Sequence, residues 1–179
     1  FDYLRRLLRE RSGLVLSAEK QYLAESRLLP VARKHGLGSL GELVERLKMA
    51  AAAPLNVEVV EAMTTNESFF FRDKIPFAHT SDTMMPALLV SRAREKRIRI
   101  WCSACATGQE PYSLAMSLKG FGAALAGWTV DILATDISNE VLTRAKAGRD
   151  NQVEVQRCLP IENLVRFFSH VGGAWEIAP

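Results

Sequence analysis

The segment 97–136 constrains the fold most, because it places a glycine loop and a helix between two apolar strands. RIRIWCSA (97–104) alternates isoleucine and cysteine with charged or bulky side chains, which is the period of a strand. The loop ATG (106–108) leads into QEPYSLAMSLKG, where Pro111 suits the first turn of a helix. WTVDILATD (128–136) is a second apolar strand. This order predicts a right-handed βαβ unit, and hence a parallel sheet.

The residues after this unit continue the alternation of helix and strand. SNEVLTRAKAG (138–148) predicts a helix with Ser138 as its cap and Gly148 as its stop. Nearer the end of the sequence, IENLVRFF is amphipathic and AWEIAP is typical of a short strand.

The first third of the chain predicts a small helical bundle. Ser17 can cap a helix that contains Pro30, which weakens the prediction that this helix is continuous. Ser39 and Glu42 form an S-x-x-E capping box ahead of leucines at helical spacing. Pro54 suits the first turn of a further helix.

The composition excludes several classes of protein. Hydrophobic residues make up 48% of the 179 residues, which indicates a packed core rather than disorder. No apolar run approaches the ~18 residues of a membrane span, and the N-terminus FDYLRRLLRE lacks a signal-peptide pattern. Three cysteines are a small and odd set, which favours a reduced cytosol over a disulfide scaffold. We therefore expect a cytoplasmic protein without membrane insertion.

The charge is uneven along the chain. Residues 1–50 hold ten Lys/Arg and six Asp/Glu, a net of +4, whereas the whole chain carries +3. A basic first third can steer an acidic partner, although a set of solvated helix faces explains the same excess. The excess is too small, and too little interleaved with aromatic residues, to predict nucleic-acid binding.

The loop after the first strand is a candidate site, because nucleotide-like ligands bind where a parallel strand turns into a helix. Gly108 allows close approach of the backbone, and Glu110 lies in the first helical turn, where the helix dipole favours a carboxylate. The G-x-G-x-x-G pattern of a dinucleotide site is absent, which disfavours a nicotinamide oxidoreductase. A plain strand-to-helix turn capped by Glu110 explains these residues equally well when they are taken alone.

Asp136 ends the second strand, at the position that commonly holds ribose hydroxyls in such sheets. The alternative is an Asx-type cap for the next helix, a role that Ser138 could fill instead. The loop and Asp136 together favour a nucleoside ligand without a diphosphate.

Cys102 and Cys105 have the C-x-x-C spacing of a redox pair. The helix signals begin several residues later than a thioredoxin-like site requires, and Cys158 with three scattered histidines does not complete a zinc site. We therefore expect no metal, and we interpret the two cysteines as small apolar residues near the strand end.

Four segments together resemble the CheR family of chemotaxis receptor methyltransferases. In the family's order, they are MTTNESFFFRD (63–73), RIWCSACATGQEPYSLAM, ILATDISNEVLTRAKAG and EVQRCLP. The resemblance covers essentially the whole chain, and its T-T-N-x-S-x-F-F-R and G-x-E-P-Y-S elements are specific. It implies transfer of a methyl group from S-adenosylmethionine to glutamate side chains on the cytoplasmic helices of chemoreceptors, with S-adenosylhomocysteine as product.

The resemblance also implies roles for individual residues. Arg72, expected to be the catalytic residue as well, can hold the methionine carboxylate bidentately. Glu110 would face the cationic amino or sulfonium end, and Asp136 would take the ribose hydroxyls. The expected cofactor-binding set is Asn66, Ser68, Arg72, Gly108, Glu110 and Asp136. Basic residues of the second helix would face acidic receptor helices, and the protein would be recruited to membrane receptor clusters. These basic residues are Arg27, Arg33 and Lys34.

The phenylalanines 69–71 are expected to anchor the junction between the helical domain and the sheet domain, with about two of the three rings buried. The polar side chains beside them would then be held rigidly toward the cofactor.

The expected fold is α/β. A small N-terminal helical bundle (1–62) precedes a linker that forms part of the cofactor site (63–78). Residues 79–179 would form the N-terminal part of an incomplete class I, Rossmann-like S-adenosylmethionine-dependent methyltransferase domain with a small β-subdomain, because the family's later R-N-V-x-I-Y-F segment does not occur in this sequence. Asp150 and Cys158 stand where the family often has an aromatic residue and a glycine.

The alternative function is a CheR-like module that senses the cofactor or docks a partner without turnover.

Overall fold

The computed structural model describes residues 1–49 and 52–178 and divides the chain into two compact units, Phe1–Thr65 and Asn66–Pro179. The segment 63–78, which the sequence predicts as a linker, is thereby divided between the two units. Within the described residues, no helix combines the length and the apolar character that crossing a membrane requires.

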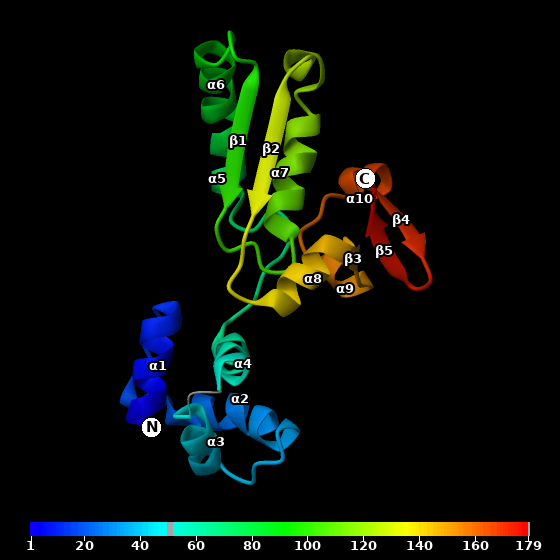
Figure 1. The fold of residues 1–179 in the computed structure, drawn as a ribbon. Coiled ribbons are helices and arrows are strands. Elements are labelled where there is room, and N and C mark those ends of the chain that lie inside the picture. Colours follow the sequence, from blue (N-terminus) through cyan, green and yellow to red (C-terminus); the bar gives the residue numbers. More distant parts are fainter. Residues whose placement is uncertain (50–51, 179) are drawn as a thin grey trace. The chain divides into compact units, whose positions relative to one another are not determined.

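The first unit is all helical (Figure 1). It comprises α1 (Asp2–Ser12), a short 3-10 turn (Ala18–Lys20), α2 (Gln21–Lys34), α3 (Leu40–Leu47) and α4 (Ala53–Met63). Its core is built from one apolar face of each α-helix, including the almost fully buried Leu8, Leu28, Leu43 and Val59. The predicted bundle is confirmed.

Local signals explain how these helices begin. Ser39 Oγ accepts from the Glu42 amide (3.2 Å), as a capping box requires, but the Glu42 carboxylate accepts from the amide of Gly38 (2.9 Å). Pro54 lies in the first turn of α4. Pro30 lies inside α2 without ending it, and α2 begins after the 3-10 turn rather than directly after Ser17.

The second unit contains the predicted βαβ arrangement. Strands β1 (Arg97–Cys102) and β2 (Thr129–Ala134) pair in parallel, and α7 (Gln109–Lys119) and a 3-10 turn (Gly122–Leu125) connect them. Figure 1 shows α7 beside β2, and α5 (Lys74–His79) and α6 (Met85–Ser91) beside β1. A π-helical turn (Thr80–Met84) joins these two helices.

A small antiparallel sheet forms the rest of the second unit. Its strand order is β3–β5–β4, from Arg149–Asp150, Ala174–Ile177 and Phe168–Val171. Helices α8 (Asn139–Ala147), α9 (Gln152–Gln156) and α10 (Ile161–Phe167) accompany it. Ser138 caps α8 and Gly148 ends it in the left-handed conformation, as predicted. The IENLVRFF segment is helical only to Phe167, because Phe168 already belongs to β4.

Phe70 ties the segment 66–72 to this small sheet. Its ring is fully buried and meets Phe168 edge-on, with centroids 5.6 Å apart, in a cluster that also includes Met116 of α7 and Val155 of α9. The expectation that about two of the three neighbouring rings are buried is wrong, because Phe69 and Phe71 are only half-buried. Phe71 instead packs edge-on against Phe77, at 5.2 Å.

Candidate cofactor site

Two backbone amides of the β1–α7 loop (103–108) donate hydrogen bonds to residues that directly follow β2. The Cys105 amide donates to the Thr135 carbonyl (3.0 Å), and the Ala106 amide donates to Asp136 Oδ2 (2.9 Å). The other carboxylate oxygen of Asp136 accepts from the Ser138 amide (3.0 Å). Asp136 therefore closes the Asx turn that was the alternative to a ribose contact. A carboxylate offers about four acceptor positions, so these two bonds leave capacity for ligand hydroxyls.

Gly108 is required by packing as well as by backbone conformation. Its φ is +101°, and a Cβ there would lie 2.9 Å from Tyr112 Cε2 and 3.2 Å from Ala145 Cα. The Tyr112 hydroxyl donates to the Ala145 carbonyl at 2.6 Å, which fixes α7 against α8. The sequence predicts a close approach to the backbone of Gly108, and Ala145 of α8 makes such an approach.

We expect Gly108→Ala to lower the free energy of unfolding by about 1–3 kcal/mol, because alanine is strained at this φ and its methyl group meets backbone atoms. Chemical denaturation measures this loss. Gly13→Ala is a matched control, since Gly13 also has a positive φ (+72°) but nothing within 4 Å of the added Cβ. An equal loss in both variants would mean that the contacts of the added methyl group with Tyr112 and Ala145 contribute nothing.

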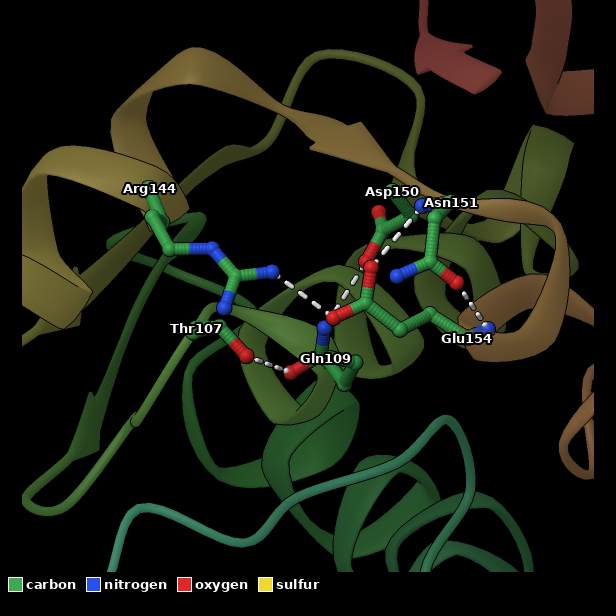
Figure 2. Close-up of polar contacts among 6 residues, drawn as sticks. All are labelled: Thr107, Gln109, Arg144, Asp150, Asn151 and Glu154. Carbon is green, nitrogen blue, oxygen red and sulfur yellow. Dashed lines mark hydrogen bonds and ion pairs between the residues drawn. The ribbon is translucent and has the colours of Figure 1, made fainter. Parts of the chain in front are cut away.

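A chain of side-chain hydrogen bonds connects the β1–α7 loop to β3 (Figure 2). Thr107 Oγ1 donates to Gln109 Oε1 (2.7 Å), and Gln109 Nε2 donates to Asp150 Oδ1 (2.8 Å). Gln109 and Asp150 are both buried. Burial raises the pKa of Asp150 to about 6, against the opposing effect of the hydrogen bond from Gln109.

The segment 66–72 is attached to α7 through Ser113. The fully buried Ser113 hydroxyl accepts from the Phe71 amide (3.0 Å) and donates to the Gln109 carbonyl (2.6 Å). Sequence reasoning did not single out this serine, although it lies in the specific G-x-E-P-Y-S element.

Two arginines hold the same segment from its exposed side. Arg72 donates to the Glu67 carbonyl (2.9 Å), and Arg157 pairs with the Glu67 carboxylate (2.8 Å). Both guanidinium groups also lie over the Phe69 ring, at 5.5 Å and 4.3 Å. Sequence reasoning missed Arg157 because the contact spans 90 positions in the sequence. The segment is therefore fixed on both sides.

A cavity of about 310 Å³ lies against this segment. It contains two predicted site residues, Asn66 and Ser68, together with Thr107 of the β1–α7 loop. The other lining residues come from the same segment, from α7, α8 and α9, and from the position directly after α9: Glu67, Phe69, Gln109, Glu140, Val141, Arg144, Val153, Glu154 and Arg157.

The other predicted site residues do not line this cavity. Gly108 lines a second cavity of about 280 Å³, which is mostly apolar and runs between α7, β2 and α8. Arg72, Glu110 and Asp136 line neither of these two cavities. Glu110 is exposed, and Asp136 is half-buried.

The two cysteines of the C-x-x-C pattern are buried and free. Burial, reinforced by the Glu110 carboxylate, raises the pKa of Cys102 to about 12, and burial also raises the pKa of Cys105. Such thiols stay protonated near neutral pH, which disfavours thiolate chemistry.

The three basic residues predicted to face a partner differ in their surroundings. Arg27 is half-buried and donates to the carbonyls of Met63 (2.8 Å) and Thr64 (3.0 Å), so it stabilises the end of α4. Lys34 pairs with Glu58 at 2.5 Å, and Arg33 is exposed.

Two family models together match nearly the whole chain. The CheR methyltransferase all-alpha domain matches residues 1–64, and the CheR methyltransferase SAM binding domain matches residues 66–179. S-Adenosylmethionine is thereby supported as the cofactor of the second domain.

Relatives from several bacteria are similar along all or nearly all of the chain. Chemotaxis protein methyltransferase 1 of Pseudomonas aeruginosa is 42% identical over 185 residues, which cover 100% of this chain and 66% of the relative. Chemotaxis protein methyltransferase 1 of Vibrio cholerae is 38% identical, covering 93% of this chain and 60% of its own length. The Escherichia coli chemotaxis protein methyltransferase is 31% identical, covering 98% and 58%.

The chain thus spans 58–66% of the length of these three relatives. The matches confirm the resemblance that four sequence segments predicted. The chain belongs to the CheR methyltransferase family.

Proposed function

We propose that the protein containing this chain transfers a methyl group from S-adenosylmethionine to glutamate side chains of chemoreceptor cytoplasmic helices. The observation that carries this proposal is the match of both CheR domains in order along the chain. The cavity that contains Asn66, Ser68 and Thr107 supports it, because an amide and two hydroxyls beside charged groups suit a polar, charged cofactor.

The donor and acceptor set fits the cofactor's functional groups. Asn66 and Ser68 would contact it from the cavity wall, and Arg72 would pair with its carboxylate, because a guanidinium binds a carboxylate bidentately. Glu110 would face its cationic end. Asp136 would accept from the ribose hydroxyls with the lone pairs that the backbone amides leave unused.

The reaction needs little proton transfer from the protein. The bound cofactor supplies an electrophilic methyl group on a sulfonium. A glutamate acceptor has an ordinary pKa near ~4.3, so it is already ionised at neutral pH and needs no general base. This chain's own residues would bind, orient the reactants and exclude water. The rigid attachment of segment 66–72 through Ser113 and Arg157 suits that positioning task.

The basic first unit would contact the acidic receptor helices. Arg33 and Lys34 are exposed near the end of α2 and are the better candidates of the three predicted residues. Arg27 would act indirectly, because its guanidinium group holds the end of α4.

Tritium transfer from labelled S-adenosylmethionine to a receptor cytoplasmic fragment tests this function in the full-length protein. We expect incorporated label that base releases as methanol, as it does from a methyl ester. No transfer would contradict the proposal. Cofactor binding without transfer to any receptor fragment would favour a sensing or docking module instead.

A further inference from the structure

Asp150 is unusual for its position, because it is a buried carboxylate where the resemblance leads one to expect an aromatic residue. It is 5% exposed in β3 and pairs across the sheet with Trp175 of β5. Its hydrogen bond to Gln109 links β3 to the first residue of α7, directly after the β1–α7 loop. A buried carboxylate is costly unless it has a specific partner, so this hydrogen bond has structural consequences.

The ionised carboxylate fixes the direction of every hydrogen bond in this chain of side chains. A carboxylate only accepts, so Gln109 must turn its Nε2 toward Asp150 and its Oε1 toward Thr107. The Thr107 hydroxyl must then donate to Gln109. Its lone pairs remain as acceptors, and Thr107 lines the cavity that also contains Asn66 and Ser68.

Loss of the charge removes this constraint. A protonated carboxyl can donate to Gln109, the amide can then present its NH₂ group to Thr107, and the Thr107 hydroxyl can accept. Its proton would then point elsewhere. The ionised form is therefore the one in which the Thr107 hydroxyl, with its proton already donated to Gln109, can only accept from a ligand.

Several neighbouring groups act on the charge of Asp150. Glu154 of α9 disfavours the ionised form and Arg144 of α8 favours it, and these two residues pair with each other at 2.7 Å. The Tyr112 phenol of α7 also interacts electrostatically with Asp150. Burial raises the pKa of this phenol most, and the charge of Asp150 raises it further. Trp175, the partner from β5, carries no charge.

We propose that Asp150 is a positioning residue that, through Gln109, makes the Thr107 hydroxyl a hydrogen-bond acceptor for the cationic amino group of the cofactor. This inference rests on the proposed function, because it assumes that S-adenosylmethionine occupies the cavity lined by Thr107. Asp150 itself does not touch the cofactor, since Gln109 lies between Asp150 and Thr107.

The test is calorimetric titration of the full-length protein with S-adenosylhomocysteine, which retains the amino group. We expect Asp150→Asn to weaken binding by about fivefold at about pH 7.5, because asparagine can donate or accept and no longer fixes the amide of Gln109. Thr107→Val should weaken binding by a similar factor of about five, through loss of the acceptor. Asp150→Asn should then have no further effect in the Thr107→Val background, because both changes remove the same interaction.

Stability provides the readout that separates positioning from a merely structural role. Burial raises the folded-state pKa of Asp150 above its ordinary value of 3.8, so ionisation of this side chain costs the folded protein stability as the pH rises from ~4 through ~6. Asp150→Asn should therefore raise the melting temperature at about pH 7.5, with a smaller gain at about pH 5. Affinity would fall while stability rises. Asp131→Asn is the matched control, because Asp131 of β2 is exposed and pairs with Arg97 of β1 at 2.7 Å.

The outcomes distinguish this inference from the proposed function. A wild type that does not bind S-adenosylhomocysteine would overturn both. A wild type that binds, with Asp150→Asn and Thr107→Val each within twofold of it, would overturn only the positioning role. Additive losses in the double variant would also overturn it, because independent effects would mean that Asp150 does not act through Thr107.

Discussion

The Phe70→Ala variant is expected to lose about 3–5 kcal/mol of its free energy of unfolding, the range typical of a fully buried aromatic side chain. Phe70 is 0% exposed and packs against Phe168 and the cluster that joins segment 66–72 to α7 and the small sheet. The side chains around Phe70 belong to several separate segments, so we expect that they cannot close together over the cavity that the missing ring leaves. Chemical denaturation, followed by circular dichroism, measures the loss.

Phe69→Ala is the matched control for this prediction. Phe69 is the same residue type one position earlier, but it is half-buried and its ring is contacted by two arginines. We expect a loss of about 1 kcal/mol, from weakened cation–π contacts at a partly exposed site. Comparable losses in the two variants would contradict the assignment of Phe70 as the anchor.

The Arg72→Ala variant is expected to bind S-adenosylhomocysteine about 30- to 100-fold more weakly than the wild type, the loss expected when a carboxylate loses a charge-assisted partner. Stability should change by less than about 1 kcal/mol, because Arg72 is exposed and makes only contacts typical of a surface side chain: with Asp73 (3.9 Å), the Glu67 carbonyl (2.9 Å) and the Phe69 ring (5.5 Å). Calorimetry and thermal unfolding on the same preparation measure both quantities.

Two further variants isolate the cause. Arg166→Ala removes an exposed arginine that also lies over an aromatic ring, 5.0 Å from the Phe167 centroid, and should leave cofactor binding unchanged. Arg72→Lys keeps the charge but not the bidentate geometry, so it should recover only part of the affinity. An equal loss of binding and stability in Arg72→Ala would return this residue to a structural role.

The parts of the fold that depend on local signals were predictable from the sequence. Ser39, Ser138 and Gly148 begin or end helices through contacts within a few residues, and the alternation in RIRIWC marks β1 directly. The order of strand, loop and helix then gives the parallel pairing of β1 with β2.

The small sheet could not be predicted in the same way. β3 has only two residues, which is too short for any periodic pattern, and it exists because β5 pairs with it from a distant part of the sequence. β4 begins directly after α10 with no turn signal between them. The resemblance to a family, rather than the pattern of residues, supplied the expectation of a β-subdomain.

The candidate site also divides into residues that were expected from the sequence and residues that only contacts between distant segments reveal. The resemblance to the family implied site roles for Asn66 and Ser68, and the structure brings these two residues to one cavity with Thr107. Ser113, Arg157 and Asp150 were not identified as supporting residues, because each acts on a segment far away in the sequence. The sequence left open an Asx-type cap at Asp136, which the bond from the Ser138 amide makes, but the bond from the Ala106 amide depends on the folded sheet.

We propose above all that three separate segments of this chain form one S-adenosylmethionine site. Calorimetric titration with S-adenosylhomocysteine tests it most directly, in the full-length wild type and in one variant from each segment: Asn66→Ala, Glu110→Gln and Asp136→Asn. We predict saturable binding at one site in the wild type and a loss of at least about fivefold in every variant, since each would remove one of the proposed polar contacts to the ligand. Wild-type affinity in all three variants would contradict the claim.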